Sequence, residues 1–340
     1  MIDKKVVIGG GRIPWIDTAK GLGVILVFWG HLLYGGSAIG GVINRAIYSF
    51  HMPMFFILSG YVLKDDNCSI LSFIKAKFKR ILLPALIFYI LTYPIFVLEF
   101  VLGLDVDLSI KSILYQTFYV TGRCAYNDPI WFFICLFQVL CLWKLFRLKN
   151  AGLSTLLAVT LGCFICSFLM SFLNIKWFSL FGVNKAVLGL GFLCVGNILE
   201  RLGYGYNNRM SLMLGLISLP LWLLFGVVLN GKVSMYGADY GNFVCFILSG
   251  IFGSFSIFCL SKMVDKWKFP LSISKWTTII VCSHYVLVSM FHFFAKKIEI
   301  TGMVVFDFVS FAFGIFALLL YVPASKFIVR YLPVLNGNRK

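Results

Sequence analysis

Long apolar stretches separated by short polar segments make up most of the chain. A helix needs about 20 apolar residues to cross the hydrocarbon core of a bilayer, and ten stretches come close to that length. We therefore predict an all-α polytopic membrane protein with about ten transmembrane helices, forming a single domain over residues 1–340 with a core of about 12–323. The predicted spans are 21–38, 42–63, 81–103, 130–148, 152–173, 184–200, 211–230, 241–262, 274–294 and 302–322.

A proline interrupts the helical pattern of the second predicted span. Pro53 has no backbone N–H, so the carbonyl of Ser49 loses its helical partner. We expect a kink at this point, which would open space beside His51 and give its imidazole an acceptor within reach.

Composition and charge support this class and set the orientation. Hydrophobic residues are 60% of the chain and charged residues only 13%, whereas a soluble domain has about 25% charged residues. A net charge of +17 could indicate nucleic-acid binding, but most of the 30 Lys and Arg residues fall in alternate polar segments. That asymmetry is typical of cytoplasmic segments. We therefore expect both termini in the cytoplasm, contact with membrane lipid and no nucleic-acid partner.

Neither the cysteines nor the histidines have the spacing of a metal site. Cys163 and Cys166 form a CxxC pair without a second pair, and no HExxH sequence occurs. We expect buried cysteines that act as small hydrophobic residues and no metal.

Three histidines lie near the middle of predicted spans: His31, His51 and His284. An ionisable side chain at membrane depth is a functional-site hypothesis, because hydrocarbon offers it no partner. The three could meet if the first, second and ninth spans are adjacent; the structural alternative is a set of helix–helix hydrogen bonds. A neutral imidazole in such a place can accept a proton from a hydroxyl and pass it to a leaving group, as acyl transfer to an alcohol requires.

Polar residues near these histidines are further candidates. Asn44, Tyr48, His51 and Phe55 follow the spacing of one helical face. Asp17 and Lys20 are i,i+3 neighbours that can form an ion pair. Trp131, which follows Asp128-Pro129-Ile130 at the start of a span, is either an interfacial anchor or a platform for substrate.

A cluster of basic residues precedes the third predicted span. Lys75, Lys77, Lys79 and Arg80 lie in FIKAKFKR. Lys and Arg clusters bind phosphate, so this segment either binds an acyl-CoA or only sets membrane topology.

Five segments together resemble the acyltransferase 3 family of integral membrane acyltransferases. They are WIDTAKGLGVILVFWGH (15–31), YSFHMPMFFILSGYVLK (48–64), KRILLPAL (79–86), PIWFFICLF (129–137) and ISKWTTIIVCSHYVLV (273–288). Within the family, the chain is most similar to fucose 4-O-acetylase and related sugar O-acetyltransferases. The resemblance implies acetyl-CoA as co-substrate, no tightly bound cofactor, and a hydroxyl of a glycan or lipid-linked sugar as acceptor. It places the protein in the bacterial inner membrane.

The resemblance also implies roles for particular residues. His31 and His51 match the family's two histidines and are expected to be catalytic; His284 matches a less regular one. Lys20 stands where many members have Arg, which keeps the charge but loses the planar fork, and Arg80 matches the basic residue before the third span. We expect Lys20, Lys77, Lys79 and Arg80 to bind the donor, and Asp17, Asn44, Tyr48, Trp131 and His284 to contact substrate.

Two other classes of protein remain as alternatives. One is a proton-coupled transporter or flippase for a glycolipid or small acid, and the other is a structural membrane component. We find no internal repeat of the kind many transporters have, which favours the enzyme. The sequence leaves open the acyl group, which histidine is the base, the side of transfer and whether the chain forms a homo-oligomer. We expect acceptor specificity in the segment 104–129, which carries Asp105, Asp107, Tyr126 and Asp128.

Overall fold

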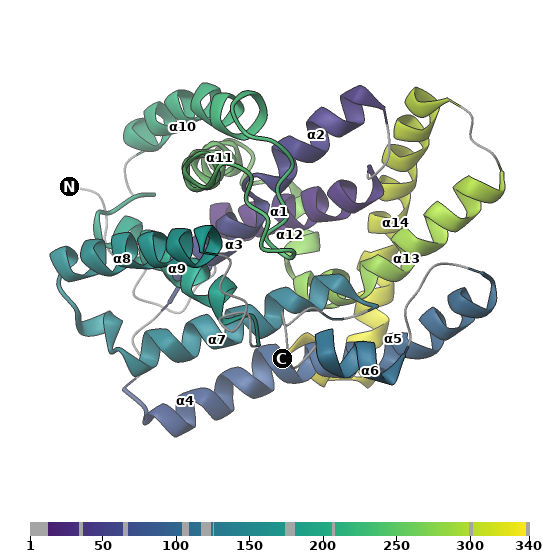
Figure 1. Ribbon diagram of the computed structural model, residues 1–340, viewed down its shortest axis with the longest axis horizontal. Helices are drawn as coiled ribbons and strands as arrows, with labels where there is room; N and C mark the ends of the chain where they lie inside the picture. Colours follow the sequence, from purple (N-terminus) through teal and green to yellow (C-terminus); the bar gives the residue numbers. More distant parts are fainter. Residues whose placement is uncertain are drawn as a thin grey trace.

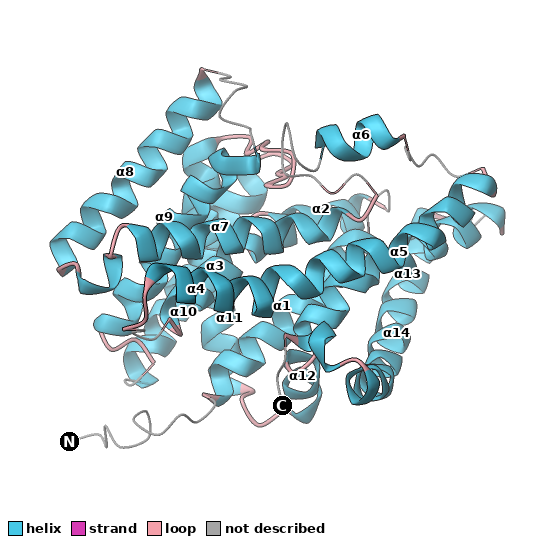
Figure 2. Cartoon of the chain, turned by 90° about the horizontal axis from the view of Figure 1, so that it is seen from below, coloured by secondary structure: helices cyan, strands magenta, loops and turns pink. Residues whose placement is uncertain are grey.

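The computed structural model describes residues 13–33, 37–63, 67–103, 109–116, 124, 126–173, 181–205, 208–298 and 302–337. All regular secondary structure in these residues is helical, apart from an isolated β-bridge between Ser234 and Asp239 (Figure 2). The helices are α1 (Pro14–Leu32), α2 (Ala38–Tyr48), α3 (His51–Tyr61), α4 (Ile70–Lys77), α5 (Leu83–Val101), α6 (Ile110–Leu114), α7 (Trp131–Leu145), α8 (Leu153–Phe172), α9 (Val183–Arg201), α10 (Asn208–Leu223), α11 (Phe243–Met263), α12 (Lys268–Ser274), α13 (Thr277–Lys297) and α14 (Met303–Tyr331).

Eight helical segments of the described residues are long and apolar enough to cross a membrane. They are Ile70–Val101, Asp128–Leu145, Leu153–Phe172, Val183–Arg201, Ser211–Val228, Phe243–Met263, Thr277–Lys297 and Met303–Tyr331. Each overlaps one of the last eight predicted spans, so the structure supports a multi-pass membrane protein. The predicted count of about ten is not reached by this criterion, since α1, α2 and α3 are not among the eight.

The first two predicted spans differ from the helices that form. The helix α1 begins at Pro14, where proline is well tolerated, and ends at Leu32 instead of 38. The prediction of one continuous span over 42–63 is wrong, because α2 and α3 have 11 residues each and are separated at Ser49 and Phe50.

The break between α2 and α3 confirms the kink expected from Pro53. The carbonyl of Ser49, which Pro53 cannot bind, accepts the hydroxyl of Ser249 at 3.2 Å. His51 is the first residue of α3. The break therefore places His51 directly after the last turn of α2, where backbone carbonyls lack the N–H partner four residues on.

The third predicted span begins earlier than expected. The helical segment Ile70–Val101 contains α4, a π-helical turn at Phe78–Leu82 and α5 without interruption. Lys77, Lys79 and Arg80 therefore lie on this helix and not in a loop between spans.

The helix α1 lies at the centre of the molecule. It contacts α2, α3, α11, α12, α13 and α14 (Figure 1). One of these neighbours, α3, also packs closely against α9. A Cβ on Gly60 would lie 1.9 Å from the carbonyl oxygen of Leu193, and one on Gly196 would lie 1.9 Å from that of Ile57. The predicted spans 1, 2 and 9, which correspond to α1, α2–α3 and α13, are thus neighbours.

Candidate active site

A cavity of about 660 Å³ lies among α1, α2, α3, α7, α13 and the segment 232–239. Asn44, Tyr48, His51 and Phe55, which the sequence places on one helical face, all line it. They do so although the helix breaks between Tyr48 and His51. The remaining lining residues are Val27, His31, Met52, Asp128, Pro129, Trp131, Phe132, Phe133, Lys232, Val233, Ser234, Met235, Tyr236, Gly237, Asp239, Thr277, Val281, Tyr285, Val288 and His292.

His31 lies in the last turn of α1, not at the middle of a longer helix. Its Nδ1 is 3.2 Å from the hydroxyl oxygen of Tyr48. The ring centroids of His284 and Tyr285 lie 5.2 and 5.5 Å from that of His31, and the ring centroids of Tyr48 and His51 are 5.0 Å apart. The structure thus gathers the three predicted histidines around Tyr48 and Tyr285.

The orientation of His51 is set by the backbone at the helix break. Its Nδ1 lies 2.8 Å from the carbonyl oxygen of Ile47. A carbonyl oxygen only accepts, so Nδ1 carries the proton, and in the neutral ring Nε2 holds the lone pair. His51 is buried and lines the cavity. This combination suits a general base.

His284 is placed differently from the other two histidines. It is 1% exposed and does not line the cavity. Its Nδ1 lies 3.2 Å from the carbonyl oxygen of Ile280 and 3.0 Å from that of Val281. His284 lies beside His31 but outside the cavity lining, so its position does not support the predicted contact with substrate.

Asn44 holds α2 against α1. Its side-chain amide donates to the carbonyl oxygen of Gly30 at 2.7 Å. At the other end of α2, the N-cap Ser37 donates its backbone N–H and its hydroxyl to the carboxylate of Asp307 on α14. These contacts fix the helix that carries Tyr48.

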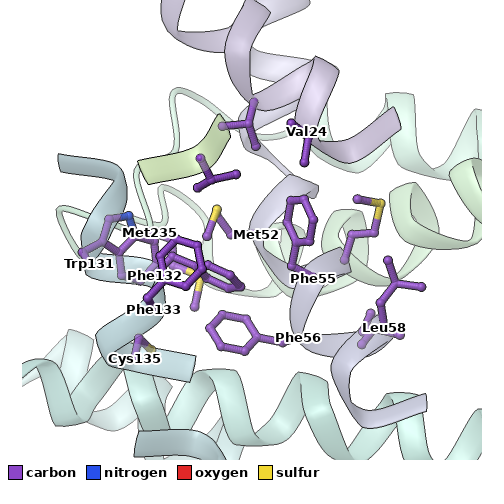
Figure 3. Packing of buried hydrophobic residues seen from close by; sticks show 14 of the residues in the cluster. Val24, Met52, Phe55, Phe56, Leu58, Trp131, Phe132, Phe133, Cys135 and Met235 are labelled. Carbon is purple, nitrogen blue, oxygen red and sulfur yellow. The ribbon is translucent and has the colours of Figure 1, made fainter. Parts of the chain in front are cut away.

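Aromatic and sulfur-containing side chains form the apolar wall of the cavity. Figure 3 shows Met52 beside Trp131, Phe132, Phe133 and Met235. The predicted helix start at Asp128–Trp131 is confirmed as a short 3₁₀ turn, Asp128–Ile130, followed by α7. Trp131 lines the cavity, as a substrate platform would.

A buried lysine lies next to Trp131. The Nζ of Lys185 is 5.1 Å from the centroid of the Trp131 ring and donates to the carbonyl oxygen of Tyr236 at 3.1 Å. The hydroxyl of Tyr236 donates to Asp128 at 2.7 Å. Burial raises the pKa of the nearby Cys124 thiol; the Asp128 carboxylate raises it further and the Lys185 ammonium lowers it. Asp128 and Lys185 therefore both bind Tyr236, which lines the cavity.

Several of these residues were not predicted from the sequence. Lys185, Tyr236 and the segment around it were not singled out, and neither was His292, whose Nε2 is 3.3 Å from the carbonyl oxygen of His31. A lysine just inside the sixth predicted span was a usable signal, because charge in a span is costly. Nothing in the local sequence indicates that the segment 232–239 lines the same cavity as the histidines, since that arrangement comes from tertiary folding.

The predicted donor-binding residues do not line the cavity. Lys20 and Asp17 form the expected ion pair, with 3.8 Å between Nζ and Oδ1. Lys77 is half-buried with its ammonium 4.9 Å from the ring centroid of Phe73, and Lys79 and Arg80 are exposed. Asp105 and Asp107 of the predicted specificity segment lie outside the described residues.

Comparison with known proteins identifies the class. The chain belongs to the acyltransferase 3 family, whose acyltransferase domain matches residues 13–325. Comparison with curated proteins and with solved structures returned no match. The protein is therefore a membrane acyltransferase, and the transporter alternative gains no support.

Proposed function

We propose that this acyltransferase moves an acetyl group from acetyl-CoA to a sugar hydroxyl of a bacterial surface polysaccharide or its lipid-linked precursor. The proposal includes its place in the bacterial inner membrane and its likeness to the fucose 4-O-acetylase branch. The observation that carries it is His51, whose ring is fixed by the Ile47 carbonyl with Nε2 as the acceptor, within a cavity of about 660 Å³.

His51 would act as the general base. Its Nε2 takes the proton of the acceptor hydroxyl while that oxygen attacks the thioester carbon of acetyl-CoA. When the tetrahedral intermediate collapses, the C–S bond breaks and the same proton passes from Nε2 to the departing sulfur. The products are the sugar acetate and the CoA thiol, and the Nδ1–H bond to Ile47 holds the ring throughout.

His31 and Tyr48 would provide a second proton site. The Tyr48 side chain neighbours both imidazoles: its hydroxyl oxygen lies 3.2 Å from the Nδ1 of His31, and its ring centroid lies 5.0 Å from that of His51. Tyr48 and His31 could therefore hold a proton between one turnover and the next.

The donor would bind at the predicted cytoplasmic end, with its phosphates near Lys20, Lys77, Lys79 and Arg80. Thr277, Val281, Tyr285, Val288 and His292 form one stripe of α13 that lines the cavity, over about 22 Å at 1.5 Å per residue. The turn Pro333–Asn336 links Arg80 to the start of this stripe: Gly337 lies against the Arg80 backbone, and Asn336 donates to the carbonyl oxygen of Lys275 at 3.3 Å.

The acceptor would bind at the opposite end, against Trp131. Lys232 and Asp239 are exposed and line the cavity together with Trp131, Asp128 and Tyr236, the last two joined by a hydrogen bond. Flat rings and a few well-placed polar groups are the usual means of holding a ligand in such a pocket. Asp17, predicted to contact substrate, lies instead beside Lys20 near the start of α1.

The test is acetyl-CoA turnover by purified protein in lipid vesicles. Wild type, His31→Ala and His51→Ala would be compared using radiolabelled acetyl-CoA and an extract of lipid-linked saccharides. We expect His51→Ala to lose at least about a hundredfold of the rate, the usual effect of removing a general base. Ser167→Ala, which alters a buried hydroxyl on α8 away from the cavity, should keep the full rate. Wild type that neither binds nor consumes acetyl-CoA would refute the proposal.

A further inference from the structure

His284 is a buried histidine, and the structure shows no hydrogen-bond partner for its Nε2 among the described residues. This nitrogen is also inaccessible to solvent. Burying a polar atom without a partner costs free energy, so such an atom in a site of this kind calls for a function.

The backbone of α13 fixes the tautomer of His284. The carbonyl oxygens of Ile280 and Val281 both lie within hydrogen-bond distance of Nδ1. Since these oxygens only accept, Nδ1 carries the proton, and Nε2 of the neutral ring is an acceptor. Phe28 covers His284 edge-on, with 5.6 Å between the ring centroids.

The neighbour that can supply a proton to this acceptor is His31. The two ring centroids are 5.2 Å apart. An N–H···N bond of about 2.9 Å between two imidazoles brings their centroids to about 5 Å, because each nitrogen lies about 1 Å from its ring centre. The observed separation of 5.2 Å therefore fits such a bond between the two rings.

We propose that His284 is a positioning residue, whose Nε2 accepts a hydrogen bond from the Nε2–H of His31. This bond fixes the tautomer of His31 and leaves its Nδ1 as the acceptor for the Tyr48 hydroxyl. The result is a directed chain from Tyr48 through His31 and His284 to the carbonyls of α13. The opposite tautomer of His31 would leave two neighbouring lone pairs without a proton between them.

The chain gives His31 a defined way to hold a proton. A proton that enters from the cavity through the Tyr48 hydroxyl ends on Nδ1 of His31, and the imidazolium keeps its Nε2–H bond to His284. When the proton leaves by the same path, every group returns to its starting state. A buried carboxylate does the same for the histidine of a catalytic triad. The catalytic value of this chain rests on the proposed function.

Three replacements of His284 separate this role from simple packing. Glutamine places an amide where Nε2 was, asparagine places one where Nδ1 was, and phenylalanine keeps the ring shape without either. We expect H284Q to keep kcat within about threefold, while H284N and H284F lose at least about tenfold with KM for acetyl-CoA unchanged. If H284N keeps the rate and H284Q loses it, the bond to α13 is what matters and the proposal is overturned.

A second readout does not depend on turnover. Nitrogen-15 spectra of histidine-labelled protein in micelles report which ring nitrogen carries a proton. We expect a protonated Nε2 on His31 in wild type, and a changed His31 signal in H284F. Ser167→Ala is the control, because it changes a buried hydroxyl on α8, which does not line the cavity. A protonated Nδ1 and bare Nε2 on His31, or a His31 signal unaffected by H284F, would overturn the inference. The expected spectra without acetyl-CoA turnover would instead overturn only the proposed function.

Discussion

The helices at the centre of the molecule and those at its edge contrast in almost every respect. The outer helices Leu153–Phe172, Ser211–Val228 and Met303–Tyr331 are continuous and apolar, and only 17, 22 and 22% of their most apolar stretch is buried. The central α1, α2 and α3 are shorter or interrupted, carry polar side chains, and are not among the helices that hydropathy identifies. The three central helices escape recognition for two reasons: polar residues lower the hydropathy of α1, and the break at Ser49 and Phe50 leaves α2 and α3 with 11 residues each. The helices α7 and α13, which also line the cavity, are recognised because they are longer and predominantly apolar.

The comparison predicts that one added methyl group has opposite effects in the two regions. A Cβ on Gly196 of α9 would collide with the backbone of α3, whereas one on Gly162 of α8 meets nothing within 4 Å. We expect Gly196→Ala to cost more than about 3 kcal/mol, since backbone cannot move aside, and Gly162→Ala to gain up to about 1 kcal/mol of helix propensity. Size-exclusion profiles and thermal unfolding in detergent measure both. Equal changes in stability for the two variants would show that the central and outer helices do not differ in this way.

Contacts between the two regions should matter for the site as well as for stability. Asp307 of the outer helix α14 binds Ser37 at the start of α2. We expect Asp307→Asn to lower stability by up to about 1.5–3 kcal/mol, the range for hydrogen bonds to a charged group. It should also lower kcat, because α2 carries Asn44 and Tyr48. Asp265→Asn, in the turn before α12, is the control. A loss of stability without loss of rate would mean that α2 is held by α1 alone.

Substitutions at the proposed acceptor end of the cavity, around Asp128 and Tyr236, should change binding of the acceptor and not the rate of the chemical step. Tyr236→Phe removes the hydrogen bond to Asp128, and we expect KM for the acceptor to rise up to about tenfold with kcat and KM for acetyl-CoA unchanged. Initial rates at varied acceptor concentration measure this effect. An unchanged acceptor KM would place acceptor binding elsewhere, and the segment 104–129 would then be examined next.

The smallest expected effect is a difference in labelling between two native cysteines. Cys68 is half-buried in the segment before α4, which is predicted to be cytoplasmic, and Cys124 is fully buried. Burial raises the pKa of Cys124, so at pH 8 its thiol stays protonated and unreactive. We expect a membrane-impermeant maleimide to label Cys68 only after the cytoplasmic side is opened. Labelling of Cys68 in sealed right-side-out vesicles would contradict the prediction that this segment is cytoplasmic.

The sequence predicted the helical class, the last eight spans and the stripe from Asn44 to Phe55, because these depend on hydropathy and helical spacing. It also predicted the consequence of Pro53, since a missing N–H is a local property. It did not predict that α2 and α3 separate fully, or that helix α4 continues into α5. The positions of Tyr236 and Lys185 at the site, and of His284 behind it, depend on long-range packing that no local pattern encodes.

The central claim is that acyl transfer occurs in the cavity between His31 and His51. The most direct test is a cryo-electron microscopy structure of the protein in nanodiscs, bound to a non-hydrolysable acetyl-CoA analogue and a Fab fragment. We predict density for the acetyl carbonyl within hydrogen-bond reach of Tyr48 or the two histidines, with the nucleotide toward Arg80. An analogue bound with its acetyl group outside this cavity would contradict the account.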